Sequence, residues 1–154
     1  MIRPGFLIRP FRVEDTQQTV QLWRRCNLIV PWNDPYKDIQ RKLEVQAELF
    51  LVAVIDSKDS NAAATDGEAV AGTVMAGYEG HRGWINYLAT DPGYRRRGIA
   101  TALMEEAENL LQQRGCPKIN LQIRESNLEI RKFYEALGFR KDAAISMGKR
   151  LQYD

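Results

Sequence analysis

The stretch at residues 84–114, WINYLATDPGYRRRGIATALMEEAENLLQQR, carries the clearest structural pattern in the chain. Its first six residues, Trp84–Ala89, have the apolar and aromatic composition of a strand. Its second half repeats apolar side chains at helical spacing, which predicts a long helix from about Gly98 to Arg114. A strand that leads through a short basic loop into an amphipathic helix is one unit of a layered α/β protein.

The segments before residue 84 predict two helices and three strands. In chain order they are a short edge strand Phe6–Pro10, a helix that begins at Asp15, a helix from about Pro35 to Glu48, and strands Phe50–Ile55 and Val70–Tyr78. Asp15 and Gln18 have the spacing of a capping box, which marks the start of the first helix. The strand Val70–Tyr78 is expected to pair antiparallel with Trp84–Ala89 across the turn at residues 80–83.

After the long helix the sequence predicts a strand, a last helix over roughly Leu128–Leu137, and one or two short strands from Phe139 onward. The predicted fold class is α/β (α+β), with a single mixed twisted sheet of about six to seven strands flanked by about four helices. We expect one domain over residues 1–154, with the polar segment 56–69 as a mobile hairpin loop.

The composition excludes several classes of function. The chain is 44% hydrophobic and 27% charged, and its 22 basic residues nearly balance 20 acidic ones, so no nucleic-acid partner is expected. Cys26 and Cys116 lie far apart and His81 is the only histidine, which argues against a metal site. No apolar run reaches the length of a membrane span, and residues 1–5 do not begin a signal peptide. We therefore expect a cytoplasmic protein with no membrane partner.

The loop at residues 95–100, RRRGIA, has the features of an anion site. The first N–H groups of a helix have no intrahelical partner and carry partial positive charge. Gly98 and Ala100 leave the backbone accessible to a bulky anion, and three arginines add fixed positive charge. The loop is therefore a candidate pyrophosphate site, with a solvated basic loop as the alternative reading.

Two segments make the chain resemble the GNAT superfamily of acyl-CoA N-acyltransferases. Residues 90–100, TDPGYRRRGIA, are similar to its signature Gln/Arg-x-x-Gly-x-Gly/Ala and to the V-x-P-x-x-R approach before it. Asn127 and residues 133–139, FYEALGF, look like its N…xFYexxGF segment. Shorter matches over nearly the whole chain, such as Pro31–Pro35 and Arg114–Ile119, resemble the small bacterial YpeA-type acetyltransferases.

The resemblance implies how acetyl-CoA would bind. Two parallel central strands, here Trp84–Thr90 with a bulge near its end and Lys118–Ile123, would splay apart and admit the pantetheine arm. A backbone N–H on the first strand would hold the thioester carbonyl and stabilise the oxyanion as it forms. The implied acetyl-CoA-binding residues are Leu88, Ala89, Thr90, Arg95, Arg96, Arg97, Gly98, Ile99, Ala100, Thr101, Asn127 and Tyr134.

The chemistry of acyl transfer to an amine makes two demands. A lysine-like amine, with a pKa of about 10.4, must lose a proton before it attacks. The departing thiolate is helped by an acid, and a phenol stays protonated at neutral pH. The resemblance assigns the acid to Tyr134, although helical periodicity alone favours a core tyrosine there. Glu79, His81 and Asp34 are the alternatives for the base, with Glu79 slightly ahead.

The acceptor side is expected at the loop before the second helix. Trp32, Asn33 and Asp34 are candidates to line it, and a hydrophobic staple is the other reading of Trp32. The predicted function is transfer of the acetyl group to a primary amine by direct attack in a ternary complex. The acceptor alternatives are a protein N-terminus, a lysine side chain and a small amine. A non-catalytic acyl-CoA sensor or interaction module is the rival function, a nucleic-acid-binding domain is disfavoured, and a homodimer stays open because dimers are common in the superfamily.

Overall fold

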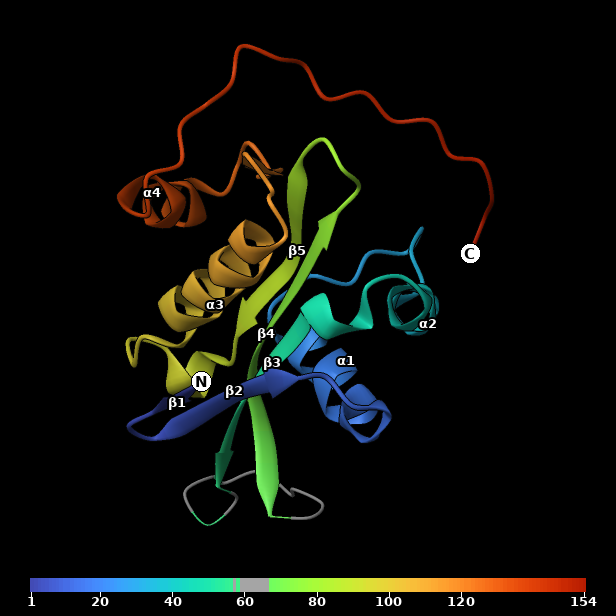
Figure 1. Cartoon of the computed structure of the whole chain (residues 1–154). Coiled ribbons are helices and arrows are strands. Elements are labelled where there is room, and N and C mark those ends of the chain that lie inside the picture. Colours follow the sequence, from blue (N-terminus) through green and yellow to red (C-terminus); the bar gives the residue numbers. More distant parts are fainter. Residues whose placement is uncertain (57, 59–66) are drawn as a thin grey trace.

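A single sheet runs through the computed structural model, which describes residues 1–56, 58 and 67–154 (Figure 1). Six strands of this described part lie in chain order across it: β1 Ile2–Arg3, β2 Phe6–Pro10, β3 Phe50–Asp56, β4 Glu68–Tyr78, β5 Gly83–Thr90 and β6 Ile119–Leu121. Neighbouring strands are antiparallel except β5 and β6, which are parallel. The predicted mixed sheet of about six strands is confirmed, although β1 lies outside the expected edge strand Phe6–Pro10.

Within the described residues, four α-helices flank the sheet. They are α1 Thr16–Arg25, α2 Pro35–Glu44, α3 Ile99–Gln113 and α4 Leu128–Ala136. Figure 1 shows α3 across one face and α1 on the other. Side chains of β3 alternate between the two cores: Leu51 and Ala53 pack with α3, whereas Phe50 and Val52 pack with α1 and α2. The continuous apolar run of β3 therefore follows from burial on both faces.

Gly72 sets how closely α3 approaches the sheet. A Cβ atom on Gly72 would lie 2.7 Å from Cγ2 of Ile99, 3.0 Å from Cδ1 of Leu103 and 3.1 Å from the carbonyl oxygen of Ala89. Glycine is therefore needed for close packing at this point of β4. The contact brings the start of α3 against β4 and the end of β5, where the basic loop leaves the sheet.

The second helix ends earlier than the predicted end near Glu48. α2 ends at Glu44, because Val45 is extended and Gln46 has a φ of 56°. Residues Ala47–Leu49 form a separate 3₁₀ turn. The side chain of Gln46 bonds the backbone of Tyr78, so contact with β4 ends the helix early.

The predicted capping box at the first helix is also wrong. Asp15 is the N-cap residue of α1, as expected, but its side chain makes no cap bond to the helix. Its carboxylate instead forms a buried ion pair with Arg9 and accepts the N–H of Arg12. Gln18 accepts the N–H of Val70 at 2.9 Å through Oε1, so it bonds the sheet. Tertiary partners thus replaced the local contacts that the spacing suggested.

No strand follows α4 in residues 137–154, which corrects the expectation of one or two short strands there. Figure 1 shows this tail running from α4 over the sheet toward α2. Its side chains contact β6 and the segment around it, with Lys118 bonding Asp142 at 2.8 Å. The tail ends where Asp154 accepts the N–H of Asp34 at 2.9 Å and pairs with Arg41.

The hairpin loop expected at residues 56–69 falls largely on residues 57 and 59–66, which lie outside the described part of the chain; at its ends Asp56 pairs with Glu68. Within the described residues, no helix is both long enough and apolar enough to cross a bilayer.

Candidate active site

The parallel strands β5 and β6 part after three residue pairs. Their pairing covers Gly83–Ile85 and Ile119–Leu121, whereas β5 continues to Thr90. On the side of β5 that faces β6, residues 86–90 have no strand partner among the residues that the structure describes. The predicted splay of the central parallel strands is therefore present, and it leaves backbone groups of β5 available to an extended ligand.

A bulge interrupts β5 in the same region. Met75 pairs with Asn86 and Thr73 pairs with Ala89, so β5 holds one residue more than β4 between these pairs. Tyr87 in the bulge has a φ of 51°, which is uncommon for a residue with a side chain. Bulges re-aim side chains and end pairing next to active sites. The bulge expected near the end of this strand is confirmed.

The loop from β5 into α3 leaves its backbone donors free at a helix start. Gly98 is the N-cap with a φ of 79°, and a Cβ atom there would meet nothing within 4 Å. The first bond of this helix end runs from the N–H of Ala102 to the carbonyl of Gly98 at 3.0 Å. The N–H groups of residues 99–101 therefore precede the helical ladder and can bind an anion.

The three arginines of the loop add positive charge to this helix start. Arg95, Arg96 and Arg97 are exposed, and within the described chain no acidic side chain forms an ion pair with them. The guanidinium of Arg97 lies 5.1 Å from the ring centroid of Tyr94. Exposed donors, open space and unpaired positive charge fit a diphosphate.

Tyr134 lies in the core on the α3 side. It is 7% exposed, and its ring meets Phe133 and Phe139 edge-on at centroid distances of 5.3 and 5.6 Å. Burial raises the pKa of Tyr134 to about 12. No described residue hydrogen-bonds its hydroxyl group, which stays protonated at neutral pH. The residue is thus both a core side chain, as periodicity suggested, and a phenol that keeps a proton to give.

Asn127 begins α4. Its Oδ1 accepts the N–H of Ile130 at 3.2 Å, which is the bond of an N-cap residue. The side chain is exposed. Its structural role in the helix therefore occupies one oxygen and leaves its side-chain N–H groups for other contacts.

Glu79 and His81 lie in the β4–β5 turn, at the other end of β5 from the basic loop. Oε1 of Glu79 accepts the N–H groups of His81 and Arg82 at 2.6 and 2.5 Å, and these bonds lower the pKa of Glu79. The bulge residue Tyr87 lies four residue steps along β5 from Gly83, a length of about 13 Å. The structure therefore does not bring these two candidate bases to the bulge or the basic loop.

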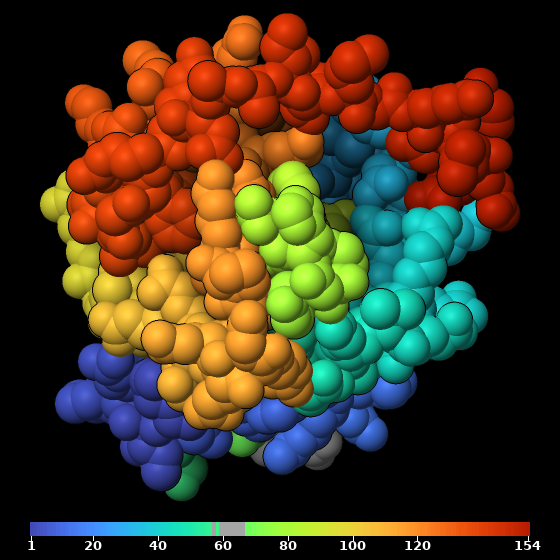
Figure 2. Space-filling model, turned by 45° about the horizontal axis from the view of Figure 1, so that its top comes forward, coloured from blue at the N-terminus to red at the C-terminus, as the bar shows by residue number. Residues whose placement is uncertain are grey.

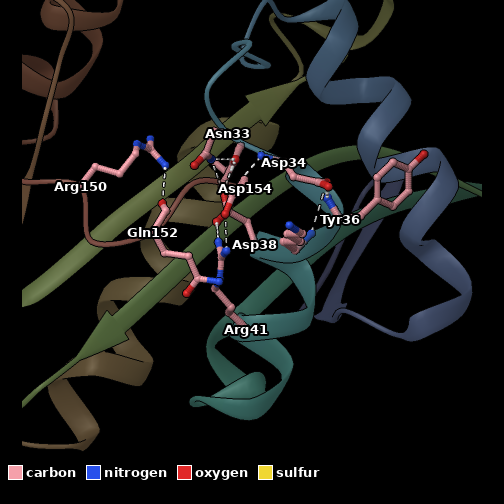
Figure 3. A network of polar contacts seen from close by, with 10 residues as sticks. Asn33, Asp34, Tyr36, Asp38, Arg41, Arg150, Gln152 and Asp154 are labelled. Carbon is pink, nitrogen blue, oxygen red and sulfur yellow. Dashed lines mark hydrogen bonds and ion pairs between the residues drawn. The ribbon is translucent and has the colours of Figure 1, made fainter.

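The loop before α2 holds the three candidate acceptor residues, of which Figure 3 labels Asn33 and Asp34. Asp34 caps α2, accepting the N–H of Tyr36 at 2.9 Å. Trp32 is 63% exposed, so it is not a buried staple. Asn33 donates to the hydroxyl oxygen of Tyr87 at 3.2 Å. Of the three candidates, Asn33 is thus the one that contacts the bulge.

Figure 2 shows a hollow in the surface beside this loop. Its borders are the red C-terminal tail, the green β4–β5 turn and the blue chain that leads into α2. Between the tail and α2, Arg41, residues 148–152 and Asp154 also line an open cavity of ≈ 560 Å³. Among the described residues, no three His, Cys, Asp or Glu side chains gather as metal ligands would.

Sequence reasoning missed the polar contacts around the bulge. The hydroxyl of Tyr87 donates to Oδ2 of Asp38 at 2.6 Å. The backbone carbonyl of Tyr87 accepts a hydrogen bond from Oγ1 of Thr73 at 2.8 Å. Trp23 in turn donates from Nε1 to Oγ1 of Thr73 at 2.9 Å. These residues come from α1, α2, β4 and β5, and neither spacing nor composition marks them as neighbours.

Solved structures with this fold carry several acyl-transfer functions. The chain is 24% identical to a protein chain in the NatC complex bound to Gag peptide and CoA, with 90% of this chain and 86% of that one covered and a TM-score of 0.71. The chain is 22% identical to the ribosomal-protein-S18-alanine N-acetyltransferase from Escherichia coli, with 89% of this chain and 79% of that one covered and a TM-score of 0.68. It is 20% identical to the glucosamine-6-phosphate N-acetyltransferase from Arabidopsis thaliana, with 96% of this chain and 99% of that one covered and a TM-score of 0.65.

The sequence also matches a family model. The match covers residues 16–139 and so includes α1, the bulged strand, the basic loop and α4. The model is that of the acetyltransferase (GNAT) family. With the splayed parallel strands and the open start of α3, this match shows that the chain belongs to the GNAT acetyltransferase family.

Proposed function

We propose that this protein is an N-acetyltransferase that transfers the acetyl group of acetyl-CoA to a primary amine by direct attack in a ternary complex. The observation that carries the proposal is the open helix start at Gly98 beside the unpaired edge of β5. The helix start suits the diphosphate of acetyl-CoA, and the β5 edge suits its extended pantetheine arm. The two features are adjacent in the chain.

Acetyl-CoA would supply the acyl group as a thioester, which is activated toward amines. The N–H groups of residues 96–101 would bind the diphosphate, with Arg95, Arg96 and Arg97 adding charge. Backbone groups of Leu88, Ala89 and Thr90 would pair with the arm. An N–H at the bulge would stabilise the negative charge that develops on the carbonyl oxygen.

Tyr134 would give a proton from its hydroxyl oxygen to the departing sulfur. Its burial and its pKa of about 12 support this role, because the phenol is protonated at every physiological pH. Asn127 at the start of the same helix would orient the arm through its free side-chain N–H groups. A phenol that donates rather than attacks is consistent with transfer in one step, without an acylated side chain.

The acceptor would enter through the hollow beside the loop at residues 31–34 (Figure 2). The relatives differ in their acceptors, since one acts on the alanine of a ribosomal protein and another on an amino sugar phosphate. We propose a primary amine as the shared chemistry. A protein N-terminus, a lysine side chain and a small amine remain the three acceptor classes to screen by thiol release.

Calorimetric titration with acetyl-CoA tests the proposal, using Gly98→Glu and Gly115→Glu. Both glycines flank α3 with a positive φ, 79° and 76°, and a Cβ atom on either would meet nothing within 4 Å. Backbone strain and added charge are therefore matched. We expect the wild type and Gly115→Glu to bind and Gly98→Glu to lose binding by more than about tenfold, because its carboxylate repels the diphosphate.

Two results would contradict the proposal. A wild type that does not bind acetyl-CoA would favour the interaction module that keeps this fold without the chemistry. Equal losses in Gly98→Glu and Gly115→Glu would assign the effect to strain and remove the argument for a diphosphate at the helix start. Circular dichroism of both variants checks that the fold is retained.

A further inference from the structure

The bulge residue Tyr87 has a backbone conformation that its surroundings must hold. Its φ of 51° lies in the left-handed region, which costs free energy for a residue with a side chain. Such a conformation persists where several contacts determine it together. Tyr87 has three sets of contacts, one each for its carbonyl group, its ring and its hydroxyl group.

The carbonyl is held through a buried chain of hydrogen bonds. Nε1 of Trp23 donates to Oγ1 of Thr73 at 2.9 Å, and that hydroxyl donates to the carbonyl oxygen of Tyr87 at 2.8 Å. Trp23 and Thr73 are both fully buried. Buried polar chains that are fully paired fix a single geometry, because any unpaired member would be costly.

The ring and the hydroxyl are held from the helical layer of α1 and α2. The ring of Tyr87 stacks on Trp23 with a centroid distance of 3.8 Å and an interplanar angle of 14°. The hydroxyl donates to Oδ2 of Asp38 at 2.6 Å and accepts from Asn33 at 3.2 Å. Burial and the neighbouring carboxylate of Asp38 raise the pKa of Tyr87, so the hydroxyl keeps the proton that it donates.

Asp38 is held in turn from its own helix. Its Oδ1 accepts from Arg41 at 3.0 Å, and Arg41 also pairs with Asp154. Asn33 donates to the same Oδ2 atom that accepts from Tyr87 (Figure 3). The carboxylate is therefore surrounded by donors, and each of its oxygens has a fixed partner. A group in this setting orients its neighbours.

We infer that Asp38 is a positioning residue for acyl transfer: by holding the Tyr87 hydroxyl, it fixes the bulge whose backbone N–H groups polarise the thioester carbonyl. The inference rests on the proposed function and extends it to a residue that touches neither acetyl-CoA nor the reacting atoms. It also links the loop before α2 to the geometry of acyl transfer. A small displacement of aligned donors is enough to slow a reaction by one or two orders of magnitude.

The test is the ¹³C signal of [1-¹³C]acetyl-CoA bound to each variant. Hydrogen bonds to the carbonyl oxygen move this signal downfield from its position in free acetyl-CoA. Tyr87→Phe removes the hydroxyl and keeps the ring. Tyr36→Phe is the matched control, since its hydroxyl bonds Gln17 at 3.2 Å on the same helical layer and does not contact the bulge. We expect Tyr87→Phe to lose at least half of the downfield displacement and Tyr36→Phe to keep it.

Asp38 is tested by two variants that differ in the hydrogen bond. Asp38→Leu removes the acceptor of the Tyr87 hydroxyl, whereas Asp38→Asn keeps an oxygen there without the charge. We expect kcat to fall about tenfold in Asp38→Leu and Tyr87→Phe, with KM for acetyl-CoA within about twofold of wild type. Asp38→Asn should keep kcat within about threefold and keep the bound ¹³C signal. The two Asp38 variants still test the inference if Tyr87→Phe does not fold.

Each contrary result has a distinct meaning. An unchanged ¹³C displacement in Tyr87→Phe, with the wild type binding, overturns the inference and leaves the proposed function standing. A kcat in Asp38→Asn as low as in Asp38→Leu overturns it as well, because the charge would then matter and Asp38 would act on a proton. A wild type that does not bind acetyl-CoA in the calorimeter overturns the proposed function and this inference together.

Discussion

The guanidinium of Arg9 meets the carboxylate of Asp15 in a two-point ion pair, with Nη1–Oδ2 and Nη2–Oδ1 distances of 2.8 and 2.9 Å. Both side chains are buried, at 9% and 8% exposed, and Glu68 adds a further contact to Arg9 at 2.8 Å. The pair joins β2 to the turn before α1. Removing one member leaves a buried charge with too few partners, which is more costly than losing an exposed pair.

Asp15→Ala is therefore expected to lower the free energy of unfolding by about 1.5–3 kcal/mol, measured by urea denaturation, because Glu68 still pairs with Arg9. The control is Asp142→Ala, which removes an exposed partner of Lys118 and should leave the midpoint nearly unchanged. Equal midpoints for the two variants would show that the Arg9 pair contributes no more than a surface contact.

Gly72→Ala should destabilise the protein by overpacking. The new Cβ atom would lie 2.7 Å from Ile99 and 3.1 Å from the backbone oxygen of Ala89, and the backbone cannot yield as a side-chain end does. We expect a loss of about 1–3 kcal/mol in the free energy of unfolding. Gly77→Ala, on the same strand, would meet its nearest atom at 3.6 Å and is the control. A loss as large in Gly77→Ala would assign the effect to the strand and not to α3.

The helices and strands could be predicted where the pattern is local. The apolar stripe of α3 and the continuous apolar run of β3 follow from local patterns, and α3 falls within the range of about Gly98 to Arg114 that the sequence predicted. The end of α2 could not be predicted, because the contact of Gln46 with Tyr78 that ends it comes from residues far apart in the chain.

The site could be predicted in part for the same reason. The basic loop is one continuous motif, and its chemistry follows from a helix start, small residues and arginines. The network at the bulge depends on a positive φ at Tyr87 and on contacts between residues 14 to 64 positions apart, such as Thr73 to Tyr87 and Trp23 to Tyr87. Neither property has a signature in a single sequence. The sequence predicted one or two short strands from Phe139 onward, yet Ile145 and Met147 are 90% and 91% exposed and unpaired within the described chain.

Glu79→Gln is expected to change kcat by less than about twofold. The carboxylate closes its own turn by accepting two backbone N–H groups, and a glutamine oxygen can accept them as well. Steady-state thiol release with an accepted amine measures the effect. A loss of two orders of magnitude or more, with the fold intact, would instead identify Glu79 as the base.

Tyr134→Phe should lower kcat by about a hundredfold and leave the Kd for acetyl-CoA within about twofold. The substitution keeps the ring in its place between Phe133 and Phe139 and removes only the proton donor. Tyr78→Phe is the control, because its hydroxyl bonds the carbonyl of Gly80 in the exposed turn. If the wild type binds acetyl-CoA but acetylates no amine, the result favours a non-catalytic acyl-CoA sensor. An unchanged kcat in Tyr134→Phe would show that this tyrosine is not the proton donor.

The raised pKa of Tyr134 predicts a loss of stability in alkali. The folded chain holds the phenol proton up to a pKa of about 12, whereas an unfolded tyrosine releases it near its ordinary pKa of about 10. Between these values the folded state binds more protons, so the free energy of unfolding falls as the pH rises. The stabilisation is fully present below pH ~10 and is lost by pH ~12, at up to about 1.4 kcal/mol per pH unit.

Tyr134→Phe isolates this contribution, since every other group that titrates above pH 10, Tyr87 included, is the same in both proteins. Urea denaturation at pH 8, 10 and 11 should show the wild type losing stability relative to the variant only above about pH 10. Parallel curves over the whole range would mean that the phenol ionises equally in the folded and unfolded chains. Tyr134 would then be open to water in solution, and its hydroxyl would lack the dry setting on which its role as proton donor depends.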